Sequence, residues 1–347
     1  MIDRDNIILE VDDLHTSFFT ENGEVKAVDG ISFAIEKGKT LGIVGESGSG
    51  KSITSLSILR LLEGTTGKTY GNGIFFKGED LLKKSKKEMM KIRGNQISMV
   101  FQEPMTSLNP TLTCGEQIAE AIRIHQGQNK QQAHIAAVEM LRLVGIPSPE
   151  KRATQYPFEL SGGMRQRVMI AIGLSCNPDL LIADEPTTAL DVTIQAQILD
   201  LMRKLQKDLG TALMLITHDL GVVAETCDNV AVMYCGKIVE YTTVEKLFTS
   251  PKHPYTIGLL KSVPDLEGDI VEELEIIPGY VPSPYNLPQG CRFAPRCQFA
   301  KDICSESIPE LSDEGEDRQV RCFIYQTDQW DRAEVEASCP NAIKGDK

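Results

Sequence analysis

The most constraining stretch of the sequence is Gly45-Glu46-Ser47-Gly48-Ser49-Gly50-Lys51-Ser52. It follows the apolar run Thr40–Val44, which predicts a strand, and it precedes Ile53–Leu62, which predicts a helix. A glycine-rich turn between a strand and a helix points several backbone N–H groups into one concavity, where they bind phosphate oxygens. A chance Gly/Ser loop is the alternative, but the spacing and the context both match a phosphate-binding loop. The stretch therefore predicts a nucleoside triphosphate site, with Lys51 on the β- and γ-phosphates and Ser52 on Mg²⁺.

The composition limits the classes of protein that the chain can belong to. Its 347 residues allow one large domain and a smaller one, and its net charge of −13 argues against a surface built to bind nucleic acid. Residues 1–5 lack the pattern of a signal peptide, and no apolar stretch approaches the roughly 20 residues of a membrane span. We expect a soluble protein, or one that reaches a membrane through its partners.

Alternating apolar residues precede the phosphate-binding loop. Ile7–Phe19 and Ile31–Ile35 predict strands, and Glu21-Asn22-Gly23 between them is a turn signal. Antiparallel strands at this point indicate a small β-subdomain beside the nucleotide site. Phe18 and Phe19 end the first strand, where one of the two rings could stack on adenine, although both could equally be core residues.

The next part of the chain changes from strand to helix patterns. Ile97–Phe101 predicts a strand that delivers Gln102 into a proline-rich loop that can move. The residues from Leu112 to about Leu174 are mainly helical in pattern. Within them, Ser161-Gly162-Gly163 opens a helix, with Ser161 as its N-cap and with exposed N–H groups that could bind an anion. A single phosphate-binding loop has no evident need of this second anion site.

Carboxylates and a histidine follow the next two predicted strands. Leu180–Glu185 is a buried strand in pattern, and Asp184 at its end is placed to hold Mg²⁺ directly or through water. Glu185 could polarise an attacking water, and Asp191 is suited to capping the following helix. His218 follows a second apolar strand, at the sheet edge where α/β proteins bind ligands, although a lone histidine is more often structural.

Cysteines gather near the end of the chain. Of the nine cysteines, Cys291, Cys297, Cys304 and Cys322 form a cluster, with Cys339 farther on and without an expected ligand role. Without a secretory signal, a disulfide framework is the weaker explanation and metal ligation the stronger. Four close cysteines can hold zinc or an iron–sulfur cluster. The short Cys-x-x-Cys hairpins of zinc ribbons are missing, which favours the iron–sulfur cluster.

Together these motifs resemble the full motif set of an ABC-transporter ATPase, in the order of that family: Gly45–Ser52, Gln102, Leu160–Met164, Leu180–Glu185, Ala189–Asp191 and His218. The resemblance implies an α/β fold, a P-loop ABC ATPase cassette with a parallel-sheet core, an antiparallel β-subdomain and an α-helical subdomain. It assigns residues 1–250 to the nucleotide-binding domain, with the helical subdomain at about 104–175, and residues 251–347 to a small cysteine-rich C-terminal domain.

The resemblance also implies what the motifs bind. In this family two cassettes pair head to tail, and the Leu160–Met164 signature of one contacts the γ-phosphate held by the other. ATP and Mg²⁺ are the implied ligands, with Glu185 as general base and His218 orienting both Glu185 and the γ-phosphate. The Mg²⁺ ligands would be Ser52, Gln102 and Asp184. The expected nucleotide contacts are Phe18, Phe19, Gly45, Ser47, Gly48, Ser49, Gly50, Lys51, Ser52, Ile53, Gln102, Ser161, Gly162, Gly163, Asp184 and Asp191.

The last third of the chain narrows the subfamily. Ser250–Thr256, Ile277–Pro284 and Gly290–Cys297 resemble segments of oligopeptide/dipeptide importer ATPases. This implies a [4Fe–4S] cluster on Cys291, Cys297, Cys304 and Cys322, with zinc as the alternative, in a structural or regulatory role. Nothing in the sequence places that site near the nucleotide.

The implied partners are a second ABC ATPase subunit, two transmembrane permease subunits and, indirectly, an extracellular solute-binding protein. A paralogue is favoured as the second ATPase subunit, and a homodimer is the alternative. The implied location is the cytoplasmic face of a prokaryotic cell membrane.

Three other classes share parts of this motif set. DNA-repair and chromosome-organising ATPases usually add a zinc hook, a coiled coil or a second cassette, and translation-associated ABC proteins carry tandem cassettes. An exporter subunit is disfavoured by the C-terminal region. We therefore expect peptide import, with nickel or another solute as the first alternative and a soluble nucleic-acid-associated ATPase as the second; no nucleic acid is expected among the partners.

Overall fold

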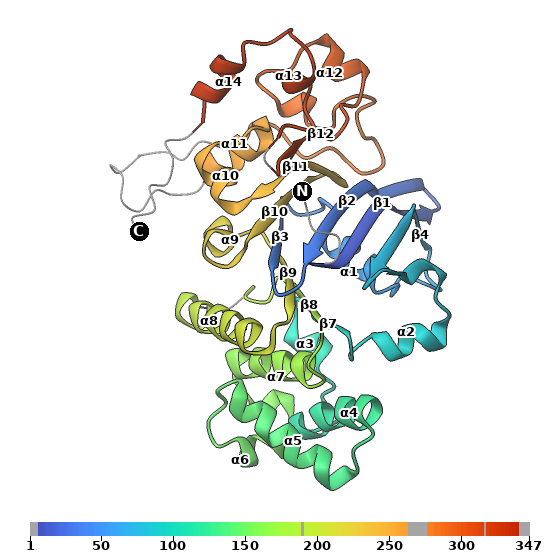
Figure 1. Cartoon of the computed structure of the whole chain (residues 1–347), viewed down its shortest axis with the longest axis vertical. Helices are drawn as coiled ribbons and strands as arrows, with labels where there is room; N and C mark the ends of the chain where they lie inside the picture. Colours follow the sequence, from blue (N-terminus) through green and yellow to red (C-terminus); the bar gives the residue numbers. More distant parts are fainter. Residues whose placement is uncertain (1–5, 189–190, 263–275, 316, 340–347) are drawn as a thin grey trace.

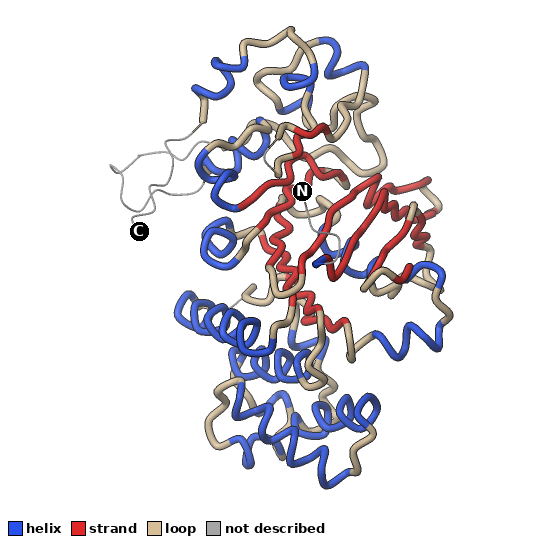
Figure 2. Tube along the Cα trace, in the orientation of Figure 1, coloured by secondary structure: helices blue, strands red, loops and turns tan. Residues whose placement is uncertain are grey.

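The computed structural model describes residues 6–188, 191–262, 276–315 and 317–339 of the chain. Figure 1 shows an elongated molecule with a lobe of helices at its lower end, two sheets in its middle and the C-terminal region at its upper end. Figure 2 shows that strands occupy the middle, with helices to the left of them and below. The sequence prediction of a mixed α/β fold is confirmed.

The central sheet carries the predicted phosphate-binding strand. Among the described residues it has eight strands, in the order β12-β13-β11-β10-β3-β9-β8-β7. The five strands from β10 to β7 are parallel, whereas β11, β13 and β12 pair antiparallel. Every residue of β3, β8 and β9 is buried, as expected where both faces of a parallel sheet are covered. The strands span Thr40–Val44 (β3), Ile97–Val100 (β7), Leu180–Asp184 (β8), Ala212–Thr217 (β9), Asn229–Tyr234 (β10), Lys237–Thr243 (β11), Ser312–Asp313 (β12) and Gln319–Val320 (β13).

A second, antiparallel sheet forms the predicted β-subdomain. Its main path is β2-β1-β5-β6, and β4 also pairs with β1. The turn at Gly23, where φ is 118°, joins β1 and β2, so the predicted strand Ile31–Ile35 is only the end of a longer one. The strands span Ile7–Thr20 (β1), Gly23–Glu36 (β2), Gly67–Tyr70 (β4), Gly73–Phe76 (β5) and Glu79–Asp80 (β6).

The helix after the phosphate-binding loop is shorter than predicted. It is α1, Lys51–Ile58, rather than a helix from Ile53 to Leu62. Arg60 has a φ of 51°, which lies outside helical backbone, and its guanidinium donates to the backbone oxygen of Leu81 at 2.7 Å. A tertiary anchor therefore ends this helix where the apolar pattern alone would continue it.

The lower lobe contains the helical region that the sequence predicts at 104–175. Side-chain caps start its longer helices: Thr113 begins α4, Asn129 begins α5 and Ser161 begins α7. The proline-rich loop after Gln102 contains one helical turn, α3, that was not predicted. The helices here span Pro104–Ser107 (α3), Cys114–Gln126 (α4), Lys130–Leu143 (α5), Pro149–Ala153 (α6) and Gly162–Leu174 (α7), with a 3-10 turn at Pro157–Glu159 (η3). Earlier in the chain, before β7, are the 3-10 turn Leu81–Lys83 (η2) and the helix Lys86–Ile92 (α2).

One side of the central sheet is covered by helices that follow its strands. Figure 1 shows α8, α9 and α10 on the left, with the antiparallel sheet on the right. Their bounds are Val192–Leu209 (α8), Leu220–Thr226 (α9), Val244–Thr249 (α10) and Pro254–Lys261 (α11). Gly210, with φ of 68°, ends α8, and its N–H bonds the Gln206 oxygen at 2.9 Å.

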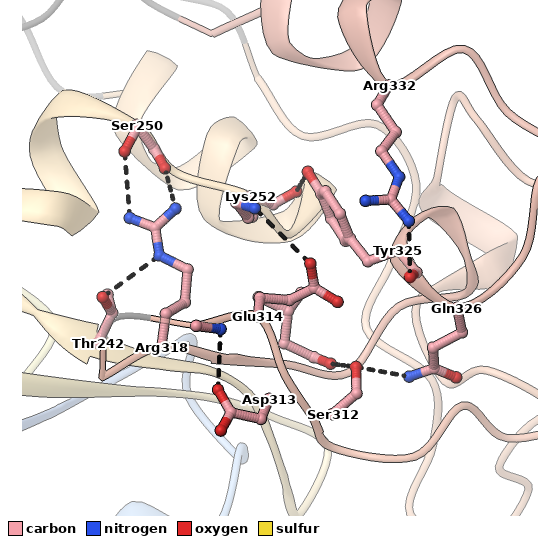
Figure 3. A network of polar contacts seen from close by, with 12 residues as sticks. Thr242, Ser250, Lys252, Ser312, Asp313, Glu314, Arg318, Tyr325, Gln326 and Arg332 are labelled. Atoms are coloured by element: carbon pink, nitrogen blue, oxygen red, sulfur yellow. Dashed lines mark hydrogen bonds and ion pairs between the residues drawn. The ribbon is translucent and has the colours of Figure 1, made fainter. Parts of the chain in front are cut away.

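The C-terminal region is built of short elements that continue the central sheet. Strand β13 pairs with β11 of the cassette, so the two regions share one sheet. Arg318 joins them further, since its guanidinium donates to the backbone oxygen of Ser250 at 2.8 Å (Figure 3) and to that of Lys246 at 3.0 Å. The remaining elements are Ala294–Arg296 (η4), Asp302–Glu306 (α12), Phe323–Gln326 (α13) and Arg332–Ala337 (α14).

Candidate nucleotide site and cysteine pocket

The phosphate-binding loop lies between β3 and α1, as predicted, and two of its glycines are required by close backbone contacts. Gly45 has a φ of 152°, and a Cβ there would lie 2.1 Å from the backbone oxygen of Met233. Gly50 has a φ of 101°, and its Cβ would lie 2.4 Å from the backbone oxygen of Ala27. Neighbouring backbone therefore fixes the loop on two sides.

Lys51 points back into the loop. Its Nζ donates to the backbone oxygens of Gly45 at 2.7 Å and Glu46 at 3.0 Å, and the residue is 6% exposed. Burial lowers the pKa of Lys51, and the carboxylates of Glu185 and Asp184 oppose that shift. An ammonium group that is held by carbonyl oxygens inside a phosphate-sized concavity is ready to exchange them for phosphate oxygens.

Ser52 and Asp184, which are two of the predicted Mg²⁺ ligands, lie next to each other. The hydroxyl of Ser52 donates to Oδ1 of Asp184 at 3.0 Å. Burial raises the pKa of Asp184, the hydrogen bond from Ser52 lowers it, and the charge of Glu185 adds to the rise. A hydroxyl beside a buried carboxylate is an oxygen pair that suits Mg²⁺.

Glu185 is held at the edge of the sheet by three side chains. Its Oε2 accepts from Nε2 of Gln102 at 2.8 Å and from the hydroxyl of Thr188 at 2.9 Å, and its Oε1 lies 3.5 Å from Nδ1 of His218. Its φ of 45° is unusual for a side-chain-bearing residue and turns it away from Asp184. The family resemblance implied the contact of His218 with Glu185, but it placed Gln102 on Mg²⁺ rather than on Glu185, and Thr188 was missed.

The signature residues lie at the start of α7, and Figure 1 places that helix with the lower lobe. Ser161 caps the helix by accepting from the N–H of Met164 at 3.4 Å, and Asp191 caps α8 by accepting from the N–H of Ile194 at 3.0 Å. A Cβ on Gly163 would lie 2.8 Å from Ile194. Within the described residues, no hydrogen bond or ion pair joins 161–163 to 45–52. The preceding residues 189–190 of the expected helix start lie outside the described ranges.

Phe18 and Phe19 occupy different faces of β1. Phe19 is 46% exposed and lies under the ammonium group of Lys68, 5.0 Å from its ring centre. Phe18 shares its face with Thr16, whose hydroxyl lies 2.7 Å from that of Ser57 in α1. Phe18 is therefore on the side of β1 that faces the helix following the phosphate-binding loop.

The four C-terminal cysteines line one pocket. Cys291, Cys297, Cys304 and Cys322 share it with apolar side chains and with His253. Burial raises the pKa of Cys297 to about 12, although a backbone hydrogen bond from Phe299 lowers it. Burial also raises the pKa of Cys291 and Cys322, and the backbone of Phe293 and Ile324 partly opposes that rise. His253 is buried and neutral; burial lowers its pKa to about 3, and its Nδ1 accepts from the N–H of Tyr255 at 3.0 Å.

Comparison with known proteins agrees with both parts of this architecture. A family model described as ABC transporter matches residues 28–188, and one described as oligopeptide/dipeptide transporter, C-terminal region, matches residues 239–304. The oligopeptide transport ATP-binding protein AppD of Bacillus subtilis is 56% identical over 319 residues, which cover 92% of this chain and 97% of the relative. The chain belongs to this family of ABC-transporter ATP-binding proteins.

Other members and cassettes agree with that assignment. The oligopeptide transport ATP-binding protein OppD of Haemophilus influenzae is 50% identical, with 92% of this chain and 98% of the relative covered. The ATP-binding cassette MJ0796, solved as a dimer in a post-hydrolysis state with ADP and Pi, matches with a TM-score of 0.61 and 27% identity. That match covers 68% of this chain and 98% of MJ0796.

Two findings qualify the predictions made for this family member. In the described part of the chain, no three His, Cys, Asp or Glu side chains are arranged to hold a metal ion, so the cysteines share a pocket without forming a ready coordination site. The sequence did not place the cysteines near the nucleotide site, and the structure shows a contact between their segment and the phosphate-binding loop. Arg296, next to Cys297, pairs with Glu46 of the phosphate-binding loop at 2.7 Å.

No described helix is both long enough and apolar enough to span a bilayer.

Proposed function

We propose that this chain is the ATP-hydrolysing subunit of an importer for dipeptides or oligopeptides, acting at the cytoplasmic face of a prokaryotic membrane. The observation that carries the proposal is the placement of Glu185. Gln102, Thr188 and His218 hold its carboxylate beside the Ser52–Asp184 pair, at the edge of the sheet that also carries the phosphate-binding loop. The match of residues 239–304 to the peptide-transporter C-terminal region supports peptides as the solute.

Hydrolysis in this scheme depends on positioning and on charge. Lys51 and the loop N–H groups bind the phosphates, and Glu185 takes a proton from the attacking water. His218 orients Glu185 and contacts the γ-phosphate. Ser52, Gln102 and Asp184 would hold Mg²⁺, which when bound neutralises charge on the phosphates. Gln102 donates to Glu185 in the structure, so it would have to give up that hydrogen bond to hold the ion, and the carboxylate would then be free to act as the base.

The proposed working unit is a pair of cassettes. Ser161 and Gly163 are at an exposed or half-exposed helix start that, within the described part of the chain, makes no hydrogen bond or ion pair with the phosphate-binding loop, which supports a role toward the ATP of a second cassette. ATP would favour the closed pair and hydrolysis would remove that preference. The loop after Gln102 would pass closure to two permease subunits. We propose a paralogue as the second cassette and an extracellular solute-binding protein as an indirect partner.

The adenine contact is assigned to Phe18 rather than Phe19. Phe18 shares the face of β1 that reaches α1 through Thr16, whereas Phe19 lies against Lys68. Phe18→Ala should weaken binding of ATP and ADP alike, while Phe19→Ala should leave both unchanged. Equal loss in the two variants would contradict the assignment.

The catalytic proposal is tested with Glu185→Gln. Losing the general base should lower the turnover of ATP by a factor of about 10² to 10⁴, while MgATP still binds and brings cassettes together. Single-turnover hydrolysis and equilibrium binding separate the two effects. Glu225→Gln is the control, because Glu225 is an exposed carboxylate whose ion pair with Arg203 is 3.8 Å long. Near-normal turnover in Glu185→Gln would remove this residue from its role. Uptake of a labelled peptide against labelled nickel in reconstituted vesicles then tests the solute.

The cysteine pocket is proposed to hold a [4Fe–4S] cluster, with zinc as the alternative. The residues fit such a group in chemistry. Four thiols share one apolar pocket, which is the type of ligand that iron–sulfur clusters and structural zinc both take. A bound cluster would supply a structural cross-link between Cys291, Cys297, Cys304 and Cys322. Anaerobic purification with iron, sulfide and zinc assays on wild type and Cys297→Ser decides between the cluster, zinc and neither.

A further inference from the structure

The C-terminal region contacts the phosphate-binding loop at Glu46. Arg296 makes a two-pronged ion pair with its carboxylate, Nη1 to Oε2 at 2.7 Å and Nη2 to Oε1 at 3.1 Å. The N–H of Glu46 donates to the hydroxyl of Tyr255 at 2.8 Å. Residues that lie more than 200 positions later in the chain therefore hold both the side chain and the backbone of the loop's second residue.

Glu46 adds a negative charge to a loop that binds phosphates, and this charge opposes phosphate binding. Its carboxylate carries the same sign of charge as the triphosphate. Glu46 also follows Gly45 directly in the chain, and the backbone oxygen of Gly45 accepts a hydrogen bond from Nζ of Lys51 at 2.7 Å. Arg296 cancels that charge and holds the side chain to the C-terminal side of the loop. Its guanidinium is fixed in turn, because Nε donates to the backbone oxygen of Pro278 at 2.9 Å. The Nε, Nη1 and Nη2 atoms of Arg296 are therefore all hydrogen-bonded, and a planar guanidinium fixed in this way is a rigid partner for a carboxylate.

The arginine is part of the same short segment as two of the pocket's cysteines. Arg296 closes the 3-10 turn Ala294–Arg296, and Cys291 and Cys297 flank that turn on either side. A second arginine of this segment, Arg292, pairs with Asp29 and donates to the backbone oxygen of Cys235. The neighbouring Gly236 N–H donates to the backbone oxygen of Ser49 at 2.8 Å. The segment is therefore connected to the phosphate-binding loop at two points.

We propose that Arg296 is a positioning residue for ATP binding, which neutralises and orients Glu46, and that the state of the four-cysteine pocket sets how well it does so. The inference rests on the proposed ATP-binding function. Anchoring Cys291 and Cys297 fixes the turn between them, and the turn fixes the direction of Arg296. Loss of that anchor frees the guanidinium, and the charge of Glu46 then opposes the triphosphate.

The first test is a double-mutant cycle read by the Kd of MgATP for the full chain, without turnover. Arg296→Gln should weaken binding about tenfold, the scale of one unscreened carboxylate acting on a nearby phosphate. Arg296→Lys should recover part of the loss, since it keeps the charge but not the fork. Glu46→Gln should bind within about twofold of wild type, and Glu46→Gln combined with Arg296→Gln should return to that level.

The matched control is Arg318→Gln. Arg318 is as buried as Arg296, at 5% against 7% exposed, and it anchors the C-terminal region away from the loop. It should leave the Kd unchanged. Should Arg296→Gln not fold, Arg296→Lys with and without Glu46→Gln carries the same comparison.

Three results would overturn the proposal. Unchanged affinity in Arg296→Gln would remove the arginine from nucleotide binding. A double variant as weak as Arg296→Gln would show that Glu46 is not the group on which Arg296 acts. A wild-type chain that does not bind MgATP would instead overturn the proposed function, and this inference with it.

The second test addresses the cysteine pocket. Cys297→Ser should weaken MgATP binding in the same direction as Arg296→Gln, and adding Glu46→Gln should restore it. Iron and zinc are assayed on the same samples, so that affinity is compared with metal content. Wild-type affinity in a Cys297→Ser protein that has lost its metal would separate the pocket from the loop and contradict this part of the proposal.

Discussion

The phosphate-binding loop and the cysteine pocket are built in opposite ways. The loop is one continuous stretch, seated between a fully buried strand and a helix, and backbone oxygens fix it at Gly45 and Gly50. The four cysteines of the pocket lie between Cys291 and Cys322, in a stretch whose helical turns and strands are two to five residues long. Helical turns of that length are not stable by themselves in water. The loop is therefore preformed, whereas the pocket depends on its neighbours and on what it binds.

The energetics of the two regions follow from this difference. Strand β3, which precedes the loop, belongs to a core with β8, β9 and β10, and Ile53 just after the loop packs against that core, so the shape of the loop is maintained by the folding of the whole cassette. The C-terminal elements share a small cluster around Val320, Ile324 and Val335. A small apolar cluster supplies little stability, and domains of this kind often rely on a metal or other cross-link. We expect substitutions in the loop to change ligand binding with little change in stability, and those in the pocket to change stability in addition to their effect on ATP affinity.

Lys51→Ala is expected to give the largest effect and tests the first half of the comparison. The variant loses a charged donor to the β- and γ-phosphates, so the Kd of MgATP should rise about 100- to 1,000-fold. Its thermal unfolding should change little, because the hydrogen bonds that the Lys51 ammonium group makes to the described residues go to two loop carbonyl oxygens and the Ser49 hydroxyl. Lys77→Ala, which removes a surface ion pair with Asp179, is the control. A Lys51→Ala protein that keeps its ATP affinity would contradict the placement of this side chain.

The same difference explains what could be predicted from the sequence. Apolar runs predict the strands of the sheet, and the glycine-rich stretch predicts the loop. Gln102, Glu185 and His218 are polar residues at strand ends, and parallel strands bring those ends to one edge of the sheet. Ser161 and Asp191 were predicted as helix caps and are caps. These features depend on neighbours in the chain or on one sheet.

The missed features depend on contacts between distant residues. Arg296 and Glu46 are 250 positions apart, and neither belongs to a pattern that would pair them. The end of α1 was placed too late because Arg60 is held by the backbone of Leu81, which the helix pattern does not contain. The pairing of β13 with β11 joins residues that the sequence assigns to two domains. Local patterns fix the elements, and long-range pairs decide how the C-terminal region meets the cassette.

Removal of the pocket's ligand should give the next largest effect. Cys297→Ser should lower the free energy of unfolding by about 2–3 kcal/mol when the wild type carries its metal, the stabilisation that a ligand supplies at about 100 times its Kd. Denaturant unfolding under anaerobic conditions measures the change. Cys339→Ser is the matched control, because its thiol donates to the backbone oxygen of Pro251 at 3.4 Å and does not line the pocket. Equal losses in the two variants would mean that the pocket does not act through a shared ligand.

Arg318→Gln is expected to give the smallest effect and tests whether the C-terminal region is held by polar contacts as well as by its pocket. The guanidinium donates to the backbone oxygen of Ser250 and to the hydroxyls of Ser250 and Thr242 (Figure 3), and also to the backbone oxygen of Lys246. A glutamine can keep only part of these bonds, so the free energy of unfolding should fall by about 1–2 kcal/mol. Hydrogen exchange should then rise in residues 312–326 before it rises in β3 or β9. Exchange that rises evenly over both regions would show that the C-terminal region and the cassette unfold as one unit, and the contrast between a preformed loop and a dependent pocket would be lost.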